Sequence, residues 1–88
     1  PSFISYIELK AANWVGTESP YSQVVTIPGV TENCKVEPDL SVNQIEAFRD
    51  KELAFSTENE DGVVTVYAIG HKPENDYTIQ VTITEVDV

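Results

Sequence analysis

The chain has 88 residues, 41% of them hydrophobic, so it is long enough for one small globular domain and too short for two. Fifteen acidic residues against five basic ones give a formal net charge of -10. This charge disfavours nucleic acid and anionic membranes as partners, because contacts with phosphate groups need clustered lysine and arginine side chains. We expect one acidic domain over residues 1–88 that binds neither.

Three strands are predicted in the N-terminal part of the chain. Residues 3–9 alternate loosely between two faces. Residues 21–27 form a β-branched run that ends at Pro28-Gly29, which is a strong turn signal. Residues 34–37 form a third, short strand that stops before a proline.

One helix is predicted over residues 42–51. Ser41 and Gln44 have the spacing of a capping box, in which each side chain bonds the backbone amide of the other residue. The apolar positions that share one face of this helix are Val42, Ile45 and Phe48. Their spacing is typical of a helix that packs against a sheet.

A hairpin follows the helix. Residues 53–58 and 63–69 flank the turn at 59–62, predicted to be of type I with Gly62 in the left-handed conformation. The strand at 63–69 is apolar on both faces, which predicts a central strand covered by a second sheet on one face and by the helix on the other.

The last strand shows the clearest alternation in the chain. Four apolar positions, beginning at Tyr77, alternate with polar ones. The polar and uncharged residues of this strand are Thr78, Gln80, Thr82 and Thr84. The whole order predicts a mainly β fold, a small antiparallel β-sandwich or open barrel with one connecting α-helix at about residues 42–51.

No residues are predicted to be catalytic. The only histidine, His71, lies in a loop, and the only cysteine, Cys34, lies in a strand, with no spacing that pairs them. One cysteine and one histidine cannot supply four zinc ligands. Acidic turns at 58–61 and 74–76 lack the twelve-residue ligand ladder of a calcium loop, although calcium binding there stays open. We expect a non-enzyme without metal or cofactor.

Two groups of residues are candidates for binding. Trp14 lies in a polar segment, where a large aromatic side chain is typical of an interface anchor. Together with Tyr21 and other tyrosines it could instead form a platform that stacks on sugar rings. The threonine-rich face of the last strand, which includes Gln80, could approach another surface without desolvation of charge.

Several stretches of the chain resemble a pattern in small prophage proteins of Firmicutes. The stretches are 14–16, 20–21, 24–30, 57–59, 61–70, 72–73 and 77–83. Those proteins are accessory products of the phage structural module, encoded near tail or baseplate components. The resemblance implies a structural or interaction module of a phage particle (tail, baseplate or head accessory), with no catalytic residues to transfer.

The resemblance further implies a small homo-oligomer that binds other virion proteins. A single cysteine and the absence of any apolar run near the about 20 residues that span a bilayer fit a protein made in the bacterial cytoplasm. It would then become part of the virion. A second hypothesis is a carbohydrate- or cell-surface-binding module that uses Trp14 and nearby tyrosines on a host glycan. A third is an Ig-like repeat cut from a larger surface protein.

Overall fold

The computed structural model describes residues 2–86, in which six strands and one α-helix follow the predicted order. Sheet A has the strand order β1-β6-β3 and sheet B the order β2-β5-β4, and every pairing is antiparallel. The strands of sheet A are β1 (Ser2–Leu9), β6 (Tyr77–Glu85) and β3 (Cys34–Asp39). Those of sheet B are β2 (Tyr21–Thr26), β5 (Val63–Ile69) and β4 (Ala54–Glu60).

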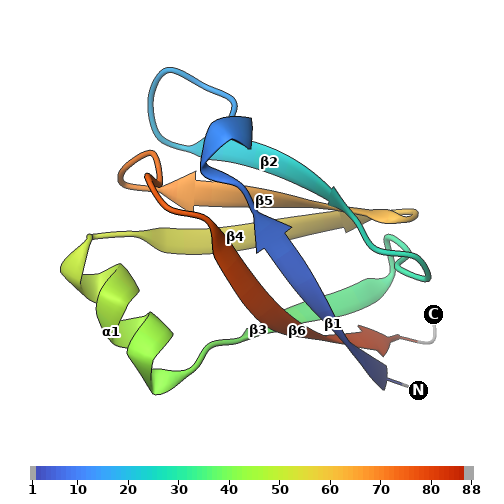
Figure 1. Cartoon of the computed structure of the whole chain (residues 1–88). Helices are drawn as coiled ribbons and strands as arrows, with labels where there is room; N and C mark the ends of the chain where they lie inside the picture. The colour runs from blue at the N-terminus through green and yellow to red at the C-terminus, as the bar shows by residue number, and fades with distance from the viewer. Residues whose placement is uncertain (1, 87–88) are drawn as a thin grey trace.

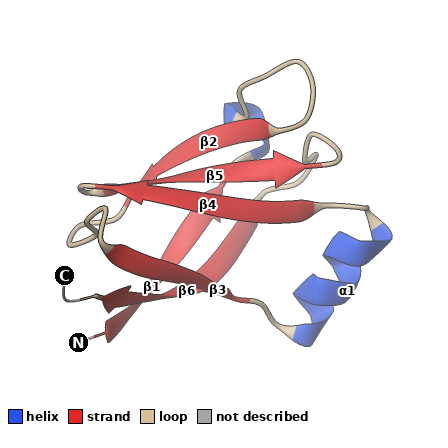
Figure 2. Ribbon diagram, turned by 180° about the vertical axis from the view of Figure 1, so that it is seen from behind, coloured by secondary structure: helices blue, strands red, loops and turns tan. Residues whose placement is uncertain are grey.

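The two sheets form the two layers of a small sandwich (Figures 1 and 2). Contacts between β1 and β2 join the layers on one side, and contacts between β3 and β4 join them on the other. The predicted mainly β fold with one connecting helix is therefore confirmed. Within residues 2–86, no helix combines the length and the apolar character needed to cross a membrane.

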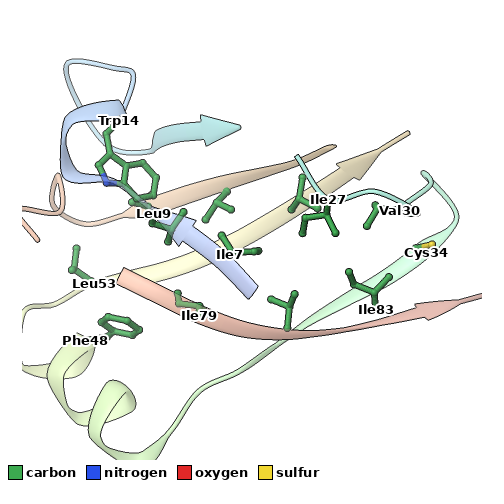
Figure 3. Close-up of a cluster of buried hydrophobic side chains, with 14 residues drawn as sticks. Ile7, Leu9, Trp14, Ile27, Val30, Cys34, Phe48, Leu53, Ile79 and Ile83 are labelled. Carbon is green, nitrogen blue, oxygen red and sulfur yellow. The ribbon is translucent and has the colours of Figure 1, made fainter. Parts of the chain in front are cut away.

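The hydrophobic core lies between the sheets and is built from every second residue of the central strands (Figure 3). Val64, Val66 and Ala68 of β5 face Ile79 and Val81 of β6 across the core, and each of these side chains is at most 4% exposed. The alternation seen in the sequence of β6 therefore corresponds to one buried and one outward face.

The capping box at the start of α1 (Val42–Asp50) is present, with Ser41 and Gln44 bonded to each other's backbone amides. Gln44 also donates a hydrogen bond from Nε2 to the Thr78 carbonyl, at 2.9 Å, which ties the helix start to β6. Lys51 caps the helix rather than belonging to it.

The expectation that α1 packs its apolar face on a sheet is wrong for most of that face. Phe48 is buried, but Ile45 is 44% and Val42 is 70% exposed. The reason is topological: α1 connects β3, an edge strand of sheet A, to β4, an edge strand of sheet B. It therefore spans the open side of the sandwich at one end (Figure 1).

β5 is a central strand, as predicted, but the helix does not cover its second face. Val63, Thr65 and Tyr67 on that outer face are half-buried, and Ile69 is 45% exposed. Side chains of the flanking strands β2 and β4 supply this partial cover. The apolar pattern on both faces of β5 therefore reflects its central position in the sheet.

The β4–β5 turn is tighter than predicted, because β4 continues to Glu60 and leaves two residues between the strands. Gly62 has φ +78°, which confirms the left-handed conformation. Its amide donates to the Val30 carbonyl at 2.7 Å, and its carbonyl accepts from Ile27 at 2.9 Å. β3 also runs past its predicted end to include Pro38, which an edge strand tolerates.

Candidate interaction surface

Trp14 lies in the core, where it is 5% exposed and stacks on Phe55 at a ring-centroid distance of 6.1 Å. The prediction that it is accessible as an interface anchor or sugar platform is therefore wrong. The cause is local: the short 3-10 turn η1 (Ala11–Asn13) precedes it, and the next residue, Val15, pairs with Ser22 of β2 through two backbone hydrogen bonds. These contacts fold the segment back and place the indole ring between the sheets (Figure 3).

The tyrosines do not complete a sugar platform either. Tyr21 is half-buried against the core, and Tyr77 packs edge-on against Phe48 at 5.0 Å. Tyr67 lies on the outer face of sheet B, whereas Tyr6, 61% exposed, lies on the outer face of sheet A. The aromatic residues singled out in the sequence are thus distributed over the core and two opposite faces.

The outer face of sheet A does carry the predicted row of uncharged polar side chains. The row consists of Thr78, Gln80, Thr82 and Thr84, which point away from the core along β6. Thr78 is exposed and the other three are half-buried between their neighbours. Because β6 is the central strand, this row runs along the middle of the sheet.

Two large apolar side chains lie beside this row on the edge strand β1. Tyr6 pairs with Gln80 and Ile4 pairs with Thr82, and each of the two β1 side chains is 61% exposed. We call the combined surface the threonine face, formed by Ile4, Tyr6, Thr78, Gln80, Thr82 and Thr84. The sequence carried a signal for it, since residues 3–9 have apolar side chains on both faces, yet only one face can lie on the core.

The opposite side of the threonine face, along β3, is charged. The Asp39 carboxylate accepts hydrogen bonds from Thr82 Oγ1 at 2.6 Å and from Gln80 Nε2 at 3.4 Å. Lys35 and Glu37 of the same strand form an ion pair at 3.1 Å. These contacts hold polar groups in place on the β3 side. On the β1 side, Ile4 and Tyr6 are uncharged, and the next outward residue, Glu8, is exposed opposite Thr78.

Cys34 and His71 do not form a catalytic pair. Cys34 is buried opposite Glu85 at the end of β6, whereas His71 precedes the start of that strand. At about 3.3 Å per residue, the nine residues of β6 separate the two by roughly 25 Å. His71 Nε2 instead lies 3.6 Å from a Glu52 carboxylate oxygen. Residues 2–86 contain no group of three or more His, Cys, Asp or Glu side chains placed to hold a metal ion.

Among the residues that the structure describes, one ionisable group has a shifted pKa. The charge of the Glu58 carboxylate is the main cause that raises the pKa of the Tyr67 hydroxyl. Partial burial of the hydroxyl, the 3.2 Å hydrogen bond that it donates to Glu58, and the charge of Glu60 raise this pKa further. A raised pKa keeps this phenol neutral at physiological pH. It does not produce an acid or base that exchanges protons near pH 7.

Comparisons of the chain with protein-family models, with curated proteins and with solved structures find no match. The chemistry of the molecular surface is therefore the basis on which a function can be assigned. Of the surfaces described above, the threonine face combines two exposed apolar side chains with a row of uncharged polar side chains. Charged residues flank it, with Glu8 opposite Thr78 at one end and Lys35, Glu37 and Asp39 along β3.

Proposed function

We propose that this chain is a non-enzymatic interaction module that assembles with copies of itself through the threonine face. The observation that supports it is the 61% exposure of both Ile4 and Tyr6 beside an uncharged polar row, in a chain with a net charge of -10. Charges resist burial because they lose hydration, so an acidic protein associates most readily where its surface lacks them.

The magnitudes indicate that the polar row takes part in the contact. Full burial of a large apolar side chain contributes about 1.5–3 kcal/mol, so covering the exposed portions of Ile4 and Tyr6 in two copies contributes roughly 4–7 kcal/mol. Association itself costs about 4–15 kcal/mol in lost freedom of motion. The contribution of the two apolar residues falls short of most of this range of costs. The methyl groups of Thr78, Thr82 and Thr84 supply further apolar area to the contact.

A closed and symmetric oligomer is the favoured form of this assembly. A chain of 88 residues has a thin core, and burial against copies of itself adds stability. A two-fold contact brings the same face of two copies together and leaves no free face for growth. Open association along sheet edges would give fibres, which repulsion between strongly acidic copies opposes.

We further propose that the assembly belongs to a phage particle, as a tail, baseplate or head accessory component made in the bacterial cytoplasm. The support is the resemblance of segments such as 24–30 and 61–70 to small prophage proteins. Mass spectrometry of gradient-purified particles from an induced prophage tests this part. The expected result is that the chain co-sediments with particles in a fixed ratio to the tail proteins. Its presence in the lysate without enrichment in particles would contradict the proposal.

A further inference from the structure

A cavity of about 320 Å³ opens on the side of the sandwich that α1 spans, between β3 and β4. Its floor includes Leu9 and Ile79, which are buried core residues, and Phe48 of α1 lines it as well. Arg49 and Ala54, both exposed, belong to its rim. The cavity therefore leads from the surface into the space between the two sheets. Its volume falls at the lower end of the about 300–1,000 Å³ typical of small-molecule sites.

The lining of this cavity is apolar with one cationic group. Among the lining residues, which all lie within 2–86, Thr57 is the one uncharged polar side chain and Arg49 the one charged side chain. Within residues 2–86, the Arg49 guanidinium makes no ion pair. Lys51 and Lys72 make no ion pair within these residues either.

Further positive charge lies next to the cavity. A second hollow, of about 250 Å³, shares Leu53 with it and contains three more basic side chains. The basic residues that line the two hollows are Arg49, Lys51, His71 and Lys72. One acidic residue, Glu74, also lines the second hollow, and Glu52 lies 3.6 Å from His71. Three of the five lysine and arginine residues and the only histidine thus line the two hollows, in segments that also carry Asp50, Glu52 and Glu74.

We propose that this cavity binds an aliphatic carboxylate of the fatty-acid type. The hydrocarbon chain lies between the sheets, against side chains such as Leu9 and Ile79, and the carboxylate lies at the rim beside Arg49. An apolar cavity with one guanidinium fits this ligand because burial of the chain supplies affinity while the charged hydrogen bond fixes its orientation. The site lies between the sheets, so it is independent of the threonine face on the outside of sheet A.

Calorimetric titration of the full chain with decanoate and with decanol tests the site. Decanoate is expected to bind saturably, and Arg49→Gln to weaken it by about tenfold, because hydrogen bonds to charged groups contribute about that much. The affinity for decanol, which has no charge, is expected to change less than twofold. Lys35→Gln is the matched control: it removes the same charge from the outer face of sheet A, and decanoate affinity should stay unchanged.

The position of the bound decanoate is checked by amide chemical shifts in an NMR titration of the full protein with decanoate. Shifts are expected at residues that line the cavity, among them Leu9, Phe48, Phe55 and Ile79. The proposal is overturned if decanoate does not bind saturably or if Arg49→Gln and Lys35→Gln weaken it equally. Shifts confined to the outer faces of the sheets would overturn it as well.

Discussion

Tyr6 of β1 lies directly opposite Gln80 of β6, with its side chain on the outer face of sheet A and 61% exposed. The same register places Ile4 opposite Thr82. Two apolar side chains of an edge strand therefore lie beside a row of uncharged polar side chains, and all of them belong to one continuous surface. A shift of the register by one residue would turn Ile4 and Tyr6 inward and expose Ile7 and Leu9.

Trp14→Ala is expected to lower the free energy of unfolding by about 3–5 kcal/mol, because it removes a buried aromatic side chain and leaves a cavity beside Phe55. Denaturant unfolding monitored by circular dichroism measures the change. Trp14→Ala should lose self-association only under conditions in which it unfolds, and the folded variant should still self-associate. A fully stable variant that no longer associates would show that Trp14 acts at an interface after all.

Gln23 should contribute to stability through hydrogen bonds that link the two sheets. Its buried side chain accepts from the Lys10 amide at 2.9 Å and donates to the Lys10 carbonyl at 3.1 Å. Gln23→Leu leaves the Lys10 amide without this partner, while the Lys10 carbonyl keeps its bond from the Asn13 amide, and the expected cost is about 1–3 kcal/mol. Asn43→Leu, at an exposed position of α1 outside the threonine face, serves as the control, with an expected change within about 0.5 kcal/mol. Equal melting curves for the two variants would contradict the assigned role.

Two glycines with positive φ should differ in their tolerance of a side chain. Gly62 has φ +78° with no heavy atom close to an added Cβ, so Gly62→Val is expected to cost about 1–2 kcal/mol from backbone strain alone. At Gly70, φ is +109° and an added Cβ would overlap the Glu52 carbonyl oxygen. Gly70→Ala should therefore be the more destabilising change, despite its smaller side chain. Thermal unfolding that ranks the two in the opposite order would contradict this account of the turns.

The stability of the folded state should depend on pH in the alkaline range because of Tyr67. Its pKa is raised above the ordinary value of 10.0, chiefly by the charge of Glu58, so the folded state holds the phenolic proton more tightly than the unfolded state does. The resulting stabilisation is present below pH 10 and is lost as the pH rises through the raised value. Glu58→Gln should lower the pKa of Tyr67, whereas Glu74→Gln should not. Phenolate absorbance measured during alkaline titration distinguishes the two, and identical curves would contradict the assignment.

The parts of the fold that were predicted correctly depend on local sequence. The capping box of Ser41 and Gln44 and the alternation in residues 77–84 each involve neighbours in the chain, and both are present. The left-handed Gly62 also follows from a short turn motif. Local chemistry of this kind determines where an element begins, which side of it is apolar, and where the chain turns.

The parts that were predicted incorrectly depend on contacts between distant segments. Trp14 is buried because a bridge between Val15 and Ser22 folds its segment inward. The exposed position of Ile45 follows from the connection between two edge strands in different sheets. The register of β1 with β6 determines which apolar face of β1 points outward, and Tyr6 is exposed because it lies on that face. The first two relationships have no counterpart in local composition. For β1 the sequence shows that one of two apolar faces must lie outward, but not which one.

The central claim is that the threonine face mediates self-association, and a pair of matched substitutions tests it most directly. Ile4 is 61% exposed on the edge strand of sheet A, and Val24 is 62% exposed on an edge strand of sheet B. Sedimentation velocity should show a discrete multimer for the wild type and for Val24→Glu, and a folded monomer for Ile4→Glu. A wild-type chain that stays monomeric at high concentration, or two variants that associate equally, would contradict the claim.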